Sequence, residues 1–161
     1  MPSTPLQVTR TQPQPRQRDW FLQHCQWTDA CWIFAPTSLL EEEHPVRIRW
    51  DFALPSGGQF TDSPHAALLE SSRRLLALIR SRSVTTGRSQ RAATVSVLFI
   101  RLRHLLIWMD GEGFARFADI DRGGLLRFHR ITLLRRNRQG TAIARTTVEL
   151  TLRVLLYLHR Y

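Results

Sequence analysis

Apolar residues recur at spacings of three and four through the second part of the chain, which is the pattern of amphipathic helices. This pattern predicts a first helix over about residues 64–81 and a second over about 89–110. A third helix is expected from Asp121 to the basic residues that begin at Arg135, and a fourth from Gly140 almost to the end of the sequence. The chain is therefore predicted to be mainly α.

Residues that cap helices mark the ends of these segments. Pro64 stands where a first helical turn begins, and Gly111 and Gly113 follow the apolar stripe of the second helix. Asp121 and Thr141 precede the third and fourth helices, and both side chains can accept a hydrogen bond from a backbone N–H group of the first turn. We therefore expect Asp121 and Thr141 to be N-caps.

The first part of the chain has a different pattern. Residues 19–62 contain four of the five Trp residues, and apolar and charged residues alternate from Val46 to Phe52, as in a strand with one buried face. Residues 1–18 are rich in Pro, Gln and Arg and have no apolar run. The predicted organisation is a disordered tail over 1–18, a Trp-rich irregular or β lead segment over 19–62 and a four-helix domain over 63–161.

The distribution of charge along the chain indicates what kind of partner it binds. The chain carries a net charge of +10, and all 23 basic residues are Arg. GC-rich coding would spread Arg along the chain, but residues 1–66 carry a net charge of −2 and residues 67–161 a net charge of +12. The guanidinium group pairs with phosphate through two hydrogen bonds. This distribution therefore predicts that the helical part binds nucleic acid.

The candidate contacts gather where the second and fourth helices begin. Backbone N–H groups point outward at a helix N-terminus, and together with the helix dipole they attract phosphate. The basic run before the fourth helix would add to the positive field there. The predicted DNA-binding residues are Arg88, Ser89, Arg91, Thr94, Arg135, Arg136, Arg138, Thr141 and Arg145.

No residue pattern predicts a cofactor, a metal or a small-molecule substrate. Cys25 and Cys31, with His24 and His44 nearby, do not form the two close ligand pairs of a structural zinc site. Two Cys residues are too few for a disulfide scaffold, and the first residues lack the apolar stretch of an export signal. The longest uncharged run, residues 30–40, is too short to cross a bilayer. We therefore expect a cytoplasmic protein that has no membrane partner.

The region from about residue 60 to residue 161 resembles a known family. Residues 102–109 (LRHLLIWM) and 113–120 (GFARFADI) are similar to the core-binding domain of tyrosine recombinases, the phage integrase family. Residues 141–157 are similar to the last helix of that domain, and the lead segment resembles what precedes the domain in some integrases.

The resemblance implies a SAM-like four-helix fold and a role in site-specific recombination and DNA integration by a mobile element. In that family the core-binding domain forms half of a clamp around duplex DNA, while a separate C-terminal domain breaks and rejoins DNA through a Tyr nucleophile. His44 with Arg47, and Tyr161, lie out of context for that catalytic set, so no catalytic residue is assigned and the chain is not expected to be an enzyme. It would be a truncated or degenerate integrase, or an excised domain, with duplex DNA and other recombinase protomers as its partners.

Three further hypotheses stay open from the sequence. An Arg-rich helical bundle can bind another recombinase protomer as a protein-interaction module, and it can bind RNA in place of DNA. It can also be an inactive remnant of an integrase. Competition between duplex DNA and RNA separates the two nucleic-acid hypotheses, and circular dichroism tests whether the chain folds.

Overall fold

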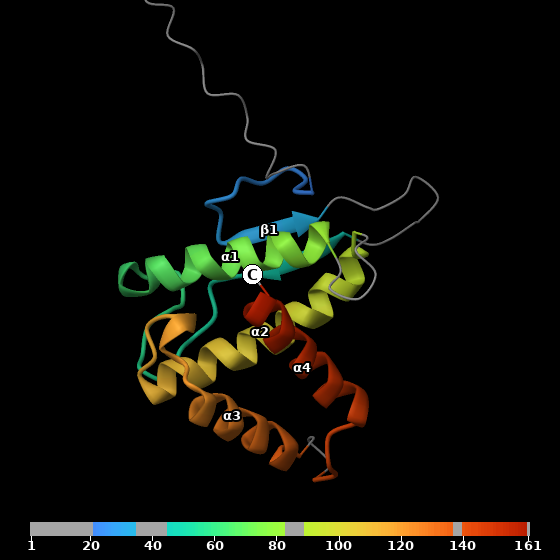
Figure 1. The fold of residues 1–161 in the computed structure, drawn as a ribbon. Coiled ribbons are helices and arrows are strands. Elements are labelled where there is room, and N and C mark those ends of the chain that lie inside the picture. Colours follow the sequence, from blue (N-terminus) through green and yellow to red (C-terminus); the bar gives the residue numbers. More distant parts are fainter. Residues whose placement is uncertain (1–20, 35–44, 83–88, 137–139, 161) are drawn as a thin grey trace, which may run out of the picture.

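In the described part of the chain, two short strands precede four helices (Figure 1). The computed structural model describes residues 21–34, 45–82, 89–136 and 140–160. The antiparallel strands are β1 (Cys31–Phe34) and β2 (Val46–Arg49), and the helices are α1 (Ala66–Ser81), α2 (Ala92–Glu112), α3 (Arg122–Leu134) and α4 (Arg145–Arg160). Short 3-10 helices at Ser63–His65 and Phe117–Asp119 precede α1 and α3. The predicted mainly α fold with a small lead segment is confirmed, and the predicted tail over 1–18 lies outside the described residues.

The ends of the first three helices agree with the capping residues in the sequence. The 3-10 helix at Ser63–His65 and α1 together cover the predicted first helix. α2 ends at Gly113, whose φ of 78° is in the left-handed region, whereas Gly111 lies inside the helix. Oδ1 of Asp121 accepts a hydrogen bond from the backbone N–H of Gly124 at 2.6 Å, so the predicted N-cap of α3 is confirmed.

The fourth helix begins later than the sequence pattern predicts. α4 starts at Arg145, so Thr141 lies four residues before the helix and the prediction that it is the N-cap is wrong. The reason is a backbone pairing, because Ala142 forms an antiparallel bridge with Arg136 directly after α3. Residues that pair in this extended form cannot also belong to the first turn of a helix, and α4 starts only beyond them.

The Trp-rich lead segment and the helices share one hydrophobic core. Burial alternates along residues 46–52 as predicted, and Trp50 is fully buried. The Trp50 ring packs edge-on against Phe99 of α2, with ring centroids 5.0 Å apart, and against Trp32 of β1, with ring centroids 5.2 Å apart. Trp50 therefore joins the small sheet to the central helix.

A buried arginine of α1 also fixes the lead segment to the helices. Arg73 is 7% exposed, and its guanidinium carbon lies 5.9 Å from the ring centroids of both Trp32 and Trp50. Its Nη2 donates hydrogen bonds to the carbonyl oxygens of Thr28 at 3.0 Å and Asp29 at 2.9 Å. Burial lowers the pKa of Arg73. Nη2 thus replaces its lost hydration with carbonyl oxygens and the planar cation lies near two aromatic rings, whereas Nε of Arg73 is buried with no acceptor among the described residues.

α2 is the central helix of the fold, in contact with α1, α4 and β2. Its buried side chains include the stripe predicted from the sequence, namely Val95, Leu98, Leu102, Leu105 and Met109. By length and composition alone, α2 is the one helix in the described part of the chain that could cross a membrane. Core helices of water-soluble proteins share these properties, and here other elements surround α2 (Figure 1).

α4 lies across α2 in the opposite direction. The start of α2 is next to the last turn of α4, where Nε2 of Gln90 donates a hydrogen bond to the hydroxyl of Tyr157 at 3.0 Å. The start of α4 faces the middle of α2 instead, because Arg101 of α2 and Thr147 of α4 line the same cavity. Arg80, which is 1% exposed, donates to the carbonyl of Gln90 and ties α1 to this contact.

Replacing Arg73 by Ala tests the role of its buried guanidinium. We expect Arg73→Ala to lower the free energy of unfolding by about 2–4 kcal/mol, because charge-assisted hydrogen bonds and cation–π contacts are lost. Urea unfolding followed by Trp fluorescence measures this change. The control Arg74→Ala removes the exposed neighbour, which pairs with Glu70 at 2.7 Å, and should cost less than about 1 kcal/mol. Equal losses in the two variants would contradict the structural role of Arg73.

Candidate nucleic-acid interface

The structure places the sequence-predicted contacts in two groups. The first group surrounds the start of α2 and consists of Ser89, Arg91 and Thr94. The second group surrounds the connection from α3 to α4 and consists of Arg135, Arg136, Thr141 and Arg145. Arg88 and Arg138 lie outside the described residues.

The two groups lie at opposite ends of α4. The start of α2 contacts Tyr157, whereas Arg145 is the first residue of α4. Tyr157 follows Arg145 by twelve positions, and this separation corresponds to about 18 Å along a helix axis. The N-termini of α2 and α4 are therefore separate places on the surface, and each needs its own assessment.

Two residues of the second group already have intramolecular partners. Nε of Arg145 lies 2.9 Å from Oε1 of Glu149 in an exposed ion pair. Nη1 of Arg136 donates a hydrogen bond to the carbonyl of Gly140 at 3.0 Å, which leaves its charge without a carboxylate. Because Glu149 partly neutralises Arg145, Arg135 and Arg136 are the stronger candidates for contact with phosphate.

A cavity of about 160 Å³ lies between α2, α3 and the start of α4. We call it the basic pocket, and its lining residues are Arg101, His104, Phe128, Thr132, Arg135, Arg136, Ile143, Thr147 and Thr151. Three of them are Arg, and no carboxylate lines the cavity within the described ranges. The basic pocket thus brings the predicted contacts Arg135 and Arg136 together with Arg101 and His104 of α2. The sequence does not single out these two residues of α2.

Positive charges in the basic pocket repel one another. The pKa of His104 is lowered to about 4, first by burial and then by the guanidinium groups of Arg135, Arg101 and Arg103. Burial and Arg135 also lower the pKa of Arg101. The His104 imidazole is therefore neutral at pH 7, and a bound anion would make its protonation easier.

One donor in the basic pocket lacks an acceptor. Nε of Arg101 is buried, and none of the described residues accepts a hydrogen bond from it. The hydroxyls of Thr132 and Thr151 donate to carbonyl oxygens one turn back on their own helices, both at 2.9 Å. An unsatisfied buried donor costs about 1–3 kcal/mol. An oxygen atom of an anionic ligand would remove this cost.

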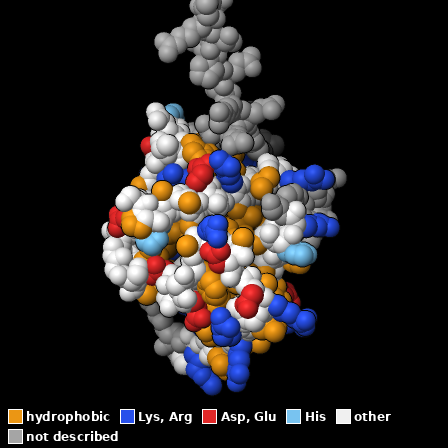
Figure 2. Space-filling view, turned by 60° about the vertical axis from the view of Figure 1, so that its left-hand side comes forward, with side chains coloured by type: hydrophobic (Ala, Val, Ile, Leu, Met, Phe, Trp, Pro, Cys, Tyr) orange, Lys and Arg blue, Asp and Glu red, His pale blue; other side chains and the backbone are white. Residues whose placement is uncertain are grey.

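Several arginines elsewhere on the described surface are matched by carboxylates. These ion pairs are Arg49 with Asp51, Arg74 with Glu70, Arg116 with Asp119 and Arg127 with Glu112. In Figure 2, Arg side chains gather at the lower end of the molecule, where Figure 1 shows α3 and the start of α4. Arg127 of α3 and Arg145 of α4 are paired with carboxylates at this end too, so the charge that is available to an anionic partner there is chiefly that of Arg135 and Arg136.

The sequence gives only a weak signal for Arg101 and His104. Their spacing of three places both side chains on one face of α2, beside the apolar stripe. A single helical His is most often an ordinary core or surface residue, so this spacing alone does not predict a site. The packing of α3 and α4 against that face of α2 creates the basic pocket.

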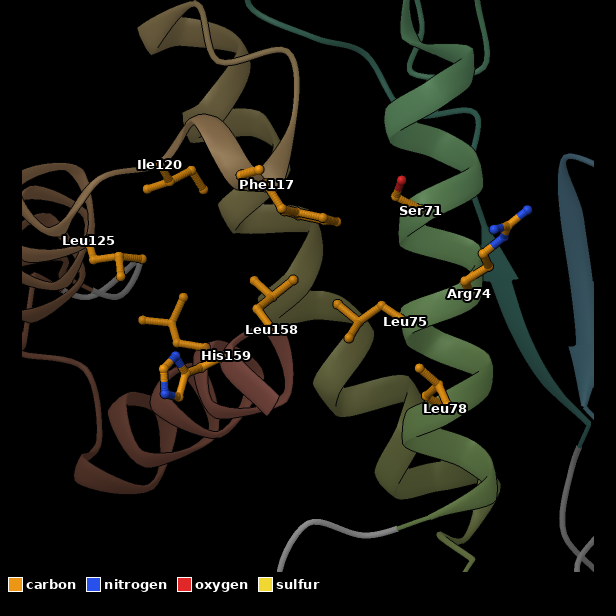
Figure 3. A pocket seen from close by; sticks show the side chains of 11 residues that line it. Ser71, Arg74, Leu75, Leu78, Phe117, Ile120, Leu125, Leu158 and His159 are labelled. Carbon is orange, nitrogen blue, oxygen red and sulfur yellow. The ribbon is translucent and has the colours of Figure 1, made fainter. Parts of the chain in front are cut away.

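A larger cavity of about 510 Å³ lies between α1, α4 and the segment that leads into α3 (Figure 3). Its walls are mainly apolar, and Leu75 of α1 points toward Leu158 of α4 across it. Phe117 and Leu125 close another side, and Arg74 and His159 lie among the few polar residues. Because these polar groups do not surround one point, this cavity is poorly suited to a phosphate.

The candidate zinc ligands of the lead segment have no metal-binding arrangement. Among the described residues, no three His, Cys, Asp or Glu side chains lie close enough together to hold a metal ion. Cys25 and Cys31 are free thiols, and Sγ of Cys25 accepts a hydrogen bond from the backbone N–H of Ile33 at 3.2 Å. His44 lies outside the described residues. The Cys25 thiol therefore serves the local backbone.

The low pKa of His104 predicts that acid destabilises the fold. The folded chain binds this proton near pH 4, whereas an ordinary His binds it near 6.5, so the unfolded chain holds more protons between these values. The free energy of unfolding should therefore fall as the pH is lowered from about 7 to 4. The full shift would correspond to about 3 kcal/mol, and because the ring is partly exposed we expect about 1–2 kcal/mol.

Urea unfolding at a series of pH values measures this effect. In His104→Gln, the fall in the free energy of unfolding between pH 7 and pH 4 should be smaller by the amount that His104 contributes, because Gln does not take up a proton. The control His159→Gln changes an exposed ring at the end of α4 and should show the same fall as the wild-type chain. A pH profile that His104→Gln leaves unchanged would contradict the assignment.

The chain matches no protein-family model, and no curated protein or solved structure matches it either. The resemblance to a core-binding domain therefore depends on the residues quoted from the sequence. The arrangement of charged groups around the basic pocket is the structural basis for a functional hypothesis.

Proposed function

We propose that this chain is a non-catalytic DNA-binding module, similar to the core-binding domain of a tyrosine recombinase. It would hold duplex DNA mainly through phosphate contacts, which fix position and carry little base specificity. The proposal gives no residue a catalytic role and requires no cofactor. Its partner is duplex DNA in the cytoplasm, with recombinase protomers as further partners on the same DNA.

The observation that carries the proposal is the concentration of positive charge at the basic pocket. Arg101, Arg135 and Arg136 lie together, and the described residues that line the cavity include no carboxylate to balance them. Guanidinium groups form charge-assisted hydrogen bonds with phosphate, and each phosphate that they neutralise releases counterions from DNA. A surface of this kind favours a polyanion over a neutral or basic partner.

The predicted contact residues have different weights in this proposal. Arg135 and Arg136 would contact phosphates directly, with Thr141 exposed beside them. Arg145 would exchange its ion pair with Glu149 for a phosphate, which lowers its net contribution. The start of α2, with Ser89, Arg91 and Thr94, would form a separate contact region at the other end of α4.

Charge reversal of Arg135 tests the proposal. We expect Arg135→Glu to weaken binding to a labelled duplex about tenfold at 0.1 M salt, and to reduce the slope of log K against log salt by about 1. The control Arg47→Glu makes the same charge change at an exposed position of β2. Because salt screens charges beyond about 10 Å at 0.1 M, the control should lose less than about threefold. Fluorescence anisotropy across a salt series measures both.

Two outcomes would contradict the proposal. The first is a folded wild-type chain, shown by circular dichroism, that has no measurable affinity for duplex DNA at low salt. The second is an equal loss of affinity in Arg135→Glu and Arg47→Glu, because binding would then depend on net charge and not on the basic pocket. Tighter binding to an RNA duplex than to DNA of the same sequence would favour the RNA hypothesis.

A second candidate function, a protein-interaction module, is favoured by the outer face of α3. Leu126, Leu133 and Leu134 are 59%, 49% and 69% exposed, and their spacing of seven and eight residues places them in one stripe. Leu156 of α4 is 56% exposed as well. Exposed apolar stripes of this kind commonly contact another protein.

Sedimentation velocity of the whole chain tests this second function for the case of self-association. We expect a species larger than a monomer at high concentration, because the α3 stripe can bury apolar surface against a second copy. The double variant Leu126→Gln/Leu134→Gln should reduce the fraction of the larger species. The control Leu152→Gln, at a side chain of α4 that is 39% exposed, should leave that fraction unchanged. A wild-type chain that stays monomeric at every concentration would count against this use of the stripe.

A further inference from the structure

The basic pocket has the features of a partly open anion site as well as those of a charged surface. We propose that it binds one phosphate group inside the cavity, between α2, α3 and the start of α4. This inference goes beyond the proposed function, because the phosphate can belong to a DNA backbone or to a free phosphate ion. The argument depends on the donors, the volume and the balance of charge in the cavity.

The donor residues come from α2 and from the chain directly after α3, and they line one cavity. Arg101 of α2 has a buried Nε–H that donates a hydrogen bond to none of the described residues. Arg135 and Arg136, directly after α3, supply two further guanidinium groups. Neutral His104 contributes a ring N–H or, when protonated, two. The oxygens of one phosphate group can accept hydrogen bonds from donors on several sides at the same time.

The cavity has room for such a group. One water requires about 10–15 Å³ of this kind of volume, and the basic pocket offers about 160 Å³. The side chains of Phe128 and Ile143 form part of the wall and cannot accept hydrogen bonds from the guanidinium groups. The apolar wall also reduces the screening of charge by solvent, which strengthens the attraction for an anion.

The balance of charge favours an anion over water alone. Burial lowers the pKa of both His104 and Arg101, and repulsion from the guanidinium of Arg135 lowers each of them further. Within the described ranges, no carboxylate lining the cavity relieves this repulsion. A phosphate would neutralise the guanidinium groups, and His104 would then gain a proton more readily.

Titration of the isotope-labelled full chain with inorganic phosphate tests the inference. We expect saturable NMR shifts of the His104 ring and the Arg101 Nε–H at millimolar phosphate, compared with sodium chloride at equal ionic strength. The pKa of His104 should rise by about 1 when phosphate is bound, because the anion stabilises the imidazolium. This pKa readout uses the wild-type chain and so does not depend on whether a variant folds.

Arg101→Met provides the matched variant. It keeps most of the side-chain length but removes the buried donor, and we expect phosphate affinity to fall at least about tenfold. The control Arg47→Met removes the guanidinium of an exposed residue of β2, which does not line the basic pocket, and should change the affinity less than about twofold. Equal losses in the two variants would overturn the assignment to the basic pocket.

A DNA duplex without terminal phosphates separates the two sources of the phosphate group. If a backbone phosphate occupies the basic pocket, the duplex should shift the same His104 and Arg101 signals and displace inorganic phosphate. If those signals respond to inorganic phosphate but not to the duplex, the ligand is free phosphate. A chain that binds phosphate but no DNA would remove the proposed function and leave this inference intact. Shifts that do not saturate, or that sodium chloride reproduces, would overturn the inference.

Discussion

The antiparallel packing of α2 against α4 decides where the candidate binding residues of the described chain lie. The apolar stripe of α2, which includes Leu98 and Leu102, must face the core, and this fixes Arg101 and His104 beside it. α4 then arrives with its first turns over the middle of α2 and its last turn beside Gln90. The same contact that closes the core therefore separates the two helix N-termini and forms the basic pocket.

The basic pocket is costly for the folded chain by itself. The partly buried guanidinium of Arg101 beside the exposed Arg135 and Arg136, a half-buried His104 that is held neutral, and an unsatisfied Nε of Arg101 all oppose folding. The shared core of the lead segment and the helices has to provide the stability that these groups remove. Local conflicts of this kind are common at functional sites, where a ligand resolves them. The conflict here involves positive charge, and so an anion is the kind of ligand that would resolve it.

The sequence predicted those features that depend on neighbouring residues. The apolar stripe of α2, the N-cap at Asp121 and the alternation around Trp50 follow from local spacing, and the structure confirms them. Thr141 was the exception, because the bridge from Ala142 back to the end of α3 outweighs a local capping preference. The contribution of Arg101 and His104 was not predictable, since it arises only when two other helices pack over their face of α2.

The number of arginines is a poorer guide to function than their position. Arg73 and Arg80 are buried and serve the fold, and Arg145 shares its charge with a carboxylate, so none of the three is simply available to DNA. Arg73 also requires a guanidinium, because a planar cation can lie against Trp32 and Trp50 and donate to carbonyl oxygens at the same time. Part of the strong preference for Arg over Lys is therefore structural. Around the basic pocket, by contrast, three guanidinium groups lie together, and no carboxylate among the described lining residues balances their charge.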